Sequence, residues 1–215
     1  MPRARGEGLA QRSVVDRSRI FLLSPANVGG ERAALLFNER ARFSLAQRLR
    51  TREGAPVGEV FSFVSGLYFR GKLTYARRFG QSPEGVGGVW IITPSRGLIP
   101  PDTPATLSLL RRFADVDIHL DEARYRRPLA RSAQALAADP NVDAILLGSI
   151  ATGKYVDILL SAFGERLLFP VEFVGRGDMS RGALLLRSAR EGRELDYAPV
   201  AGAVRRGRRA PRVWG

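Results

Sequence analysis

Four short apolar runs in the sequence are each followed by a loop of small, polar or charged residues. The runs cover residues 19–23, 89–93, 143–148 and 166–171, and their length and composition predict buried strands. The loops after them contain the candidate functional residues Ser24, Pro25 and Asn27, Pro94, Ser95 and Arg96, Ser149, and Glu172, Arg176, Asp178 and Arg181. Because parallel α/β sheets bind ligands beyond the carboxyl ends of their strands, we expect these loops to converge on one site.

The first and last of these loops contain side chains suited to hydrolytic chemistry. The amide of Asn27 can orient a water molecule or hydrogen-bond a base edge, although it can equally form the turn into the next helix. Asp178 places a carboxylate at a predicted helix start, where a simple N-cap is the alternative. Glycines flank Arg176 on both sides, and together with Arg181 this pattern indicates a phosphate clamp, with plain surface charge as the alternative.

Residues 148–154 match the spacing G-x-x-x-x-G-K of a phosphate-binding loop. Tyr155 stands where that motif requires serine or threonine to hold magnesium, so the sequence disfavours nucleotide hydrolysis. Lys154 and the helix start can still hold a phosphate, for example that of a nucleic acid; an ordinary helix start is the alternative. The single histidine, His119, lies between two predicted helices, where a structural or surface role is favoured over a catalytic one.

The pattern between the runs predicts the elements that position these loops. Helices are predicted over residues 31–50, 67–79, 121–138, 154–163 and 179–190, with another that begins at Pro104 after a Thr103 cap. A short last strand is expected within 195–200. Alternating strands and helices predict a three-layer α/β/α sandwich around a central, mostly parallel four-stranded sheet. We expect one domain over residues 19–202, between a flexible basic arm at 1–18 and an arginine-rich tail at 203–215.

The charge of the chain indicates a polyanionic partner. Its 215 residues include 34 basic and 21 acidic ones, for a formal net charge of +13, and only Lys72 and Lys154 of the basic residues are lysine. Arginine pairs bidentately with phosphate and with guanine edges, so this excess predicts contact with nucleic acid.

The composition also excludes several classes of site. No cysteine and one histidine exclude a disulfide framework, a thiolate metal site and a multi-histidine centre, so we expect no metal and no cofactor. No apolar segment is long enough to span a membrane, and the N-terminal residues lack the apolar region of a secretory signal. We therefore expect a cytoplasmic protein.

Three of the loops resemble known families. Residues 20–26, IFLLSPA, look like the opening of the YaaA-type DNA-binding stress-response family, and residues 176–181, RGDMSR, resemble an Arg-Gly-x-Met-x-Arg stretch near that family's C-terminus. Residues 92–100, ITPSRGLIP, are similar to a stretch of the glycosylase-like domain of archaeosine tRNA transglycosylases. Both groups are related in fold to the uracil-DNA glycosylase superfamily. The resemblance implies an α/β/α sandwich with a nucleic-acid groove across the strand ends.

The resemblance further implies that Asn27 positions the attacking water, as a residue of the first strand-end loop does in uracil-type glycosylases. The Gly-rich water-activating signature and the His-containing second motif of those enzymes are absent. We expect a DNA glycosylase-like enzyme that hydrolyses the N-glycosidic bond of a modified or damaged base flipped out of double-stranded DNA, in repair or in defence against phages with modified DNA.

In this hypothesis each candidate residue has a role. Asp178 stabilises the oxocarbenium-like sugar. The base pocket is lined by Ser24, Pro25, Pro94, Ser95, Ser149 and Glu172, and flanking phosphates are held by Arg96, Lys154, Arg176 and Arg181. Two alternatives remain open: a non-enzymatic DNA-binding stress protein of the YaaA type, and a nucleotide- or phosphate-binding enzyme that uses Lys154.

Overall fold

A six-stranded sheet forms the centre of the protein. The computed structural model describes residues 17–203 with the exception of residues 84 and 152. The strands occur in the order β4-β3-β1-β6-β7-β8. They are β1 (Ser18–Leu23), β3 (Val89–Thr93), β4 (Gly97–Ile99), β6 (Val142–Leu147), β7 (Leu167–Pro170) and β8 (Tyr197–Pro199). Strands β3, β1, β6 and β7 are parallel, and β4 and β8 pair antiparallel at the two edges. The protein is therefore an α/β protein with a mixed, mostly parallel sheet.

The predicted number of four strands was wrong, because it covers only the parallel part of the sheet. Gly97, with a φ of +65°, allows the chain to reverse directly after β3. The Thr93 hydroxyl donates to the Gly97 carbonyl oxygen at 2.8 Å and closes this turn. The strand expected within 195–200 is present as β8 and joins the same sheet. The strand that was not predicted, β4, has three residues and is too short to show an alternating pattern in the sequence.

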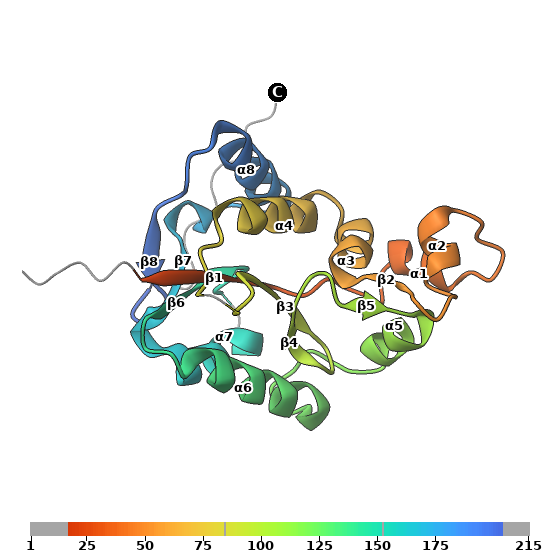
Figure 1. Ribbon diagram of the computed structural model, residues 1–215, viewed down its shortest axis with the longest axis horizontal. Helices are drawn as coiled ribbons and strands as arrows, with labels where there is room; N and C mark the ends of the chain where they lie inside the picture. The colour runs from red at the N-terminus through yellow and green to blue at the C-terminus, as the bar shows by residue number, and fades with distance from the viewer. Residues whose placement is uncertain (1–16, 84, 152, 204–215) are drawn as a thin grey trace, which may run out of the picture.

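Helices flank both faces of the sheet (Figure 1). The four longest are α4 (Leu67–Phe79), α6 (Ala123–Ala137), α7 (Gly153–Phe163) and α8 (Asp178–Glu191). Helices α4 and α8 lie together on one face, and α6 and α7 cover the other. Residues of β1 alternate between the two cores: Phe21 and Leu23 pack in the core under α4, and Ile20 and Leu22 in the core with α6 and α7. This alternation is the period of two of a strand that is buried on both faces.

The helix predicted over 31–50 is interrupted in its middle. The structure has α1 (Glu31–Phe37), α2 (Ser44–Arg48) and, before α4, a further helix α3 (Val57–Ser65). The side-chain oxygen of Asn38 accepts a hydrogen bond from the backbone N–H of Arg40 at 2.9 Å, and such a turn competes with helical hydrogen bonds. The guanidinium of Arg50 then donates to the carbonyl oxygens of Asn38 and Ala46 at 2.7 and 2.6 Å, which ties the loop to α2.

The helix predicted to begin at Pro104 begins three residues later. The two-residue strand β5 (Pro104–Ala105) pairs with β2 (Ala55–Pro56), and α5 (Leu107–Ala114) follows it. Thr106 is the N-cap, and its hydroxyl oxygen accepts from the backbone N–H of Leu109 at 3.3 Å. The predicted cap, Thr103, instead uses its backbone to hold Val57 and Pro100. The pairing of β5 with β2 is a tertiary contact that the local Thr-Pro pattern does not reveal.

Replacement of Thr106 by alanine is expected to lower the free energy of unfolding by about 1 kcal/mol, because it removes an N-cap. Thr103→Ala is the matched control and is expected to change it by less than about 0.5 kcal/mol. Urea unfolding of the two variants measures both values. Equal losses in the two variants would show that Thr106 is not the cap that stabilises α5.

Candidate functional site

The carboxyl ends of β1 and β6 lie at the point where the chain reverses its direction across the sheet. From β1 the chain passes through α4 on one face to reach β3, whereas from β6 it passes through α7 on the opposite face to reach β7. The loops after these two neighbouring strands therefore diverge. Open α/β sheets bind ligands in the crevice that such a divergence leaves.

A cleft of about 730 Å³ opens at this edge of the sheet. Its apolar walls are formed by Pro25, Val28, Pro94, Phe113, Val116 and Ile118. Its polar side chains belong to Ser24, Asn27, Asp117, His119, Lys154 and Tyr155. Apolar walls with a few convergent polar groups, in a volume of about 300–1,000 Å³, are typical of sites for small molecules. The cleft thus unites predicted residues of the loops after β1, β3 and β6.

Asn27 lies exposed at the cleft and also shapes its own loop. Its side-chain oxygen accepts a hydrogen bond from the backbone N–H of Gly29 at 3.0 Å, which confirms the turn that the sequence left open as an alternative. The amide nitrogen keeps two donors, and the oxygen keeps a second lone pair. The turn fixes the side chain in place, and these remaining groups can hydrogen-bond a water molecule or a ligand.

The carboxylate of the cleft is Asp117, which the sequence analysis did not single out. Asp117 follows α5 and lines the cleft with His119. Asp178 is not among the cleft's lining residues; it is the first residue of α8, its side chain is exposed, and it lies 3.7 Å from Arg181. The N-cap of that helix is Gly177 rather than Asp178. No local pattern marks Asp117, because only the packing of α5 beside the sheet brings its loop to the strand ends.

Ser24, which lines the cleft, is held in place by a buried lysine. Lys72 of α4 is only 2% exposed. Its ammonium group donates to the Ser24 hydroxyl oxygen at 2.8 Å and to the Ser24 carbonyl oxygen at 2.7 Å. Its Nζ also lies 4.6 and 4.7 Å from the ring centres of Tyr68 and Phe69, a distance at which a cation is attracted by an aromatic face. The sequence carried one signal for this residue: it is one of only two lysines in an arginine-rich chain.

Burial changes the protonation of this lysine. Removal from water lowers the pKa of Lys72 to about 7, although the negative charge of Asp178 acts in the opposite direction. Burial also shifts the pKa of the buried Tyr68 hydroxyl, which it raises against the opposing effect of the nearby Arg181. Lys72 is therefore a group that can gain or lose a proton near neutral pH.

Gly148, the first residue of the segment with phosphate-loop spacing, packs against Ser24. A Cβ atom on Gly148 would lie 2.7 Å from the Cβ of Ser24 and 2.9 Å from the hydroxyl of Tyr155. The Tyr155 hydroxyl donates to the Ser149 carbonyl oxygen at 2.9 Å. Gly148 is thus explained by close packing. Lys154 is exposed near the start of α7 and lines the cleft, so its predicted phosphate contact remains a prediction.

The remaining predicted residues lie outside the lining of this cleft. Ser95 and Arg96 line a separate pocket with Arg112. The Ser149 hydroxyl oxygen accepts from the backbone of Ala151, and one carboxylate oxygen of Glu172 is buried without a partner among the described residues.

The two arginines of the predicted phosphate clamp bond their own loop. Arg176 donates to the Glu172 carbonyl oxygen at 2.8 Å and Arg181 to the Phe173 carbonyl oxygen at 2.9 Å. They brace the segment before α8, and their phosphate contact stays a prediction.

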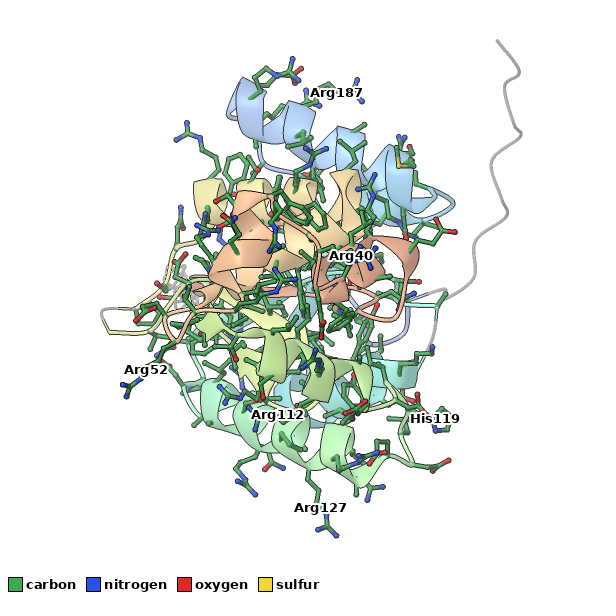
Figure 2. The ribbon with its side chains drawn as sticks, turned by 90° about the vertical axis from the view of Figure 1, so that its right-hand side faces the viewer. Arg40, Arg52, Arg112, His119, Arg127 and Arg187 are labelled. Carbon is green, nitrogen blue, oxygen red and sulfur yellow. The ribbon has the colours of Figure 1, made fainter. Side chains whose placement is uncertain are left out.

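His119 lines the cleft and belongs to the loop between α5 and α6 (Figure 2). It is exposed, and its Nδ1 accepts a hydrogen bond from the backbone N–H of Asp121 at 3.3 Å.

Within residues 17–203, apart from 84 and 152, no helix is long and apolar enough to cross a membrane. The same part of the chain contains no cluster of three or more potential metal ligands. No protein-family model, no curated protein and no solved structure matches the chain.

Proposed function

We propose that the protein is a DNA glycosylase-like enzyme that hydrolyses the N-glycosidic bond of a modified or damaged base flipped out of double-stranded DNA. The observation that supports this best is the cleft between the ends of β1, β3 and β6, in which an amide and a carboxylate stand beside apolar walls. A flipped base needs flat apolar surfaces to replace the stack that it leaves, and a few polar groups to read its edge. We also propose that the fold is the three-layer α/β/α sandwich that the resemblance implies.

The hydrolysis assigns separate roles to Asn27 and Asp117. Asn27 orients a water molecule by hydrogen bonds. Asp117 accepts a proton from this water as the water oxygen forms a bond to the sugar C1′. The C1′–N bond breaks, and its electron pair leaves with the base. The positive charge that develops on the sugar is stabilised by the carboxylate, as in other reactions with an oxocarbenium-like transition state.

The rest of the surface is suited to hold the DNA backbone. Exposed arginines project from several elements, among them Arg52, Arg112, Arg127 and Arg187 (Figure 2). Such a distribution neutralises phosphates without reading the sequence. We therefore expect the affinity for DNA to fall steeply as the salt concentration rises.

Asn27→Ala and Asp117→Asn are each expected to lower the rate of abasic-site formation about 100-fold or more, because water positioning and proton transfer are lost. The measurement is alkaline strand cleavage after incubation with duplexes that each contain one modified base. Asp178→Asn is the matched carboxylate control and is expected to retain most of the rate. The opposite result for the two aspartates would assign the carboxylate to Asp178.

Two other outcomes would replace the proposal. Salt-sensitive DNA binding without abasic sites on any substrate would favour the non-enzymatic DNA-binding function. Thermal stabilisation by a free nucleotide, lost in Lys154→Ala, would favour a nucleotide-binding enzyme.

A further inference from the structure

The Ser24 oxygens accept hydrogen bonds from Lys72, and the hydroxyl proton of Ser24 is not used in these bonds. Lys72 donates to both Ser24 oxygens, at 2.7 and 2.8 Å. The neighbouring Tyr155 donates its proton to the Ser149 carbonyl oxygen. An oxygen that accepts from Lys72 keeps its O–H for another acceptor, and the acceptor that it meets among the described residues is the hydroxyl oxygen of Tyr155. Because Ser24 and Tyr155 both line the cleft, a bound ligand can replace Tyr155 as the acceptor of this O–H.

We propose that Lys72 and Ser24 form the proton-donating end of the cleft and neutralise the base as it departs. This inference rests on the proposed glycosylase function. As the C1′–N bond breaks, its electron pair moves onto the base nitrogen system. The Ser24 proton passes to the base, a Lys72 proton passes to Ser24, and Lys72 becomes a neutral amine. Lys72 then takes a proton from solvent, while Asp117 releases to solvent the proton that it took from water.

The surroundings of Lys72 suit this role. Removal from water weakens its hold on the proton, so that the ammonium form is an acid near neutral pH. Asp178 on α8 acts on Lys72 directly, and the Tyr68 ring lies against its ammonium group. Arg181 on α8 and Tyr155 on α7 act on the hydroxyl of Tyr68. Asp178 favours the ammonium form. Among the described residues, the Lys72 ammonium group hydrogen-bonds Ser24 alone and lies over two aromatic rings, so Lys72 is a positioning residue that acts through Ser24.

The pair is tested by the acidity of the leaving base. Ser24→Ala and Lys72→Met are each expected to slow the release of an unsubstituted base about 100-fold. They are expected to slow the release of the same base with an electron-withdrawing substituent less than about 10-fold. A good leaving group needs little protonation, so it depends less on the donor. In the wild type, the rate is also expected to fall above pH 7, and Lys72→Met removes this fall. Arg70→Met, which removes a positive charge from the same helix, is expected to keep both behaviours.

A second measurement does not depend on activity. The chain contains only two lysines, so selective lysine labelling gives two side-chain NMR signals, and Lys154→Arg identifies one of them. The Lys72 signal is expected to titrate near pH 7 and to shift in Ser24→Ala. Circular dichroism of each variant shows whether it is folded.

The outcomes separate this inference from the proposed function. If the wild type forms no abasic sites but Lys72 titrates as expected, the glycosylase function and the donor role are both rejected. The coupling of Lys72 to Ser24 is then retained. Equal slowing of good and poor leaving groups overturns the donor role alone. Covalent labelling of Ser24 by a fluorophosphonate, lost in Lys72→Met, would also overturn it, because Ser24 would then be a nucleophile and Lys72 its base.

Discussion

The free energy of unfolding is expected to rise by about 3 kcal/mol as the pH increases from 7 to about 9.5, at about 1.4 kcal/mol for each pH unit. The cause is Lys72, whose pKa is lowered to about 7 in the fold from an ordinary value of 10.5. Between these values the unfolded chain binds a proton that the folded protein does not, so a rising pH favours the folded state. Below pH 7 both states are protonated, and the full penalty of burying the charge is present.

The composition leaves few other groups that titrate in this pH range. Thirty-two of the 34 basic residues are arginines, which do not titrate in it. Burial raises the pKa of Tyr68, Tyr125 and Tyr155, so their contribution to stability is lost only above about pH 10. Urea unfolding at pH 7, 8, 9 and 9.5 measures the rise, which Lys72→Met should abolish and Arg70→Met should retain. The same rise in Lys72→Met would show that Lys72 is not its source.

Gly71→Val is expected to lower the free energy of unfolding by about 3 kcal/mol, the upper part of the range for overpacked cores. Helices α4 and α8 cross at two glycines. A Cβ on Gly71 would lie 2.7 Å from the Gly182 carbonyl oxygen, and a Cβ on Gly182 would lie 2.9 Å from the Tyr68 Cα. These contacts are with backbone, so a flexible side chain cannot relieve them and the helices must separate.

The effect should extend from stability to the site, because Gly71 precedes Lys72. Thr74→Val is the matched control, since Thr74 is exposed on the same helix and receives the same β-branched side chain. It is expected to change stability by less than about 0.5 kcal/mol. Thermal and urea unfolding compare the two variants. A Gly71→Val protein as stable as the control would mean that α4 and α8 do not cross this closely.

Local patterns predicted the elements whose limits are set by their own residues. Strand β3 and helix α4 have the bounds predicted for them, 89–93 and 67–79. β3 is a continuous apolar run that ends before a proline, and α4 is followed by a glycine. The structure has helices within 31–50 and after Pro104, but the bounds predicted for them were wrong. Their limits depend on Arg50 reaching back across a loop, and on β5 pairing with a strand about fifty residues away.

The amino-acid sequence alone determined the α/β class, the mostly parallel sheet and the loops at its carboxyl edge, because hydrophobic periodicity and strand-ending prolines and glycines act over a few residues. It also determined the arginine-rich charge. Only the tertiary structure decided which side chains share the cleft and what supports them: it brought Asp117 into the lining, placed the buried Lys72 against Ser24 and left Asp178 outside the lining. The reason is that a lysine on an arginine-rich helix has no local mark of burial, and its contact with Ser24, 48 positions away in the chain, exists only when α4 packs on β1.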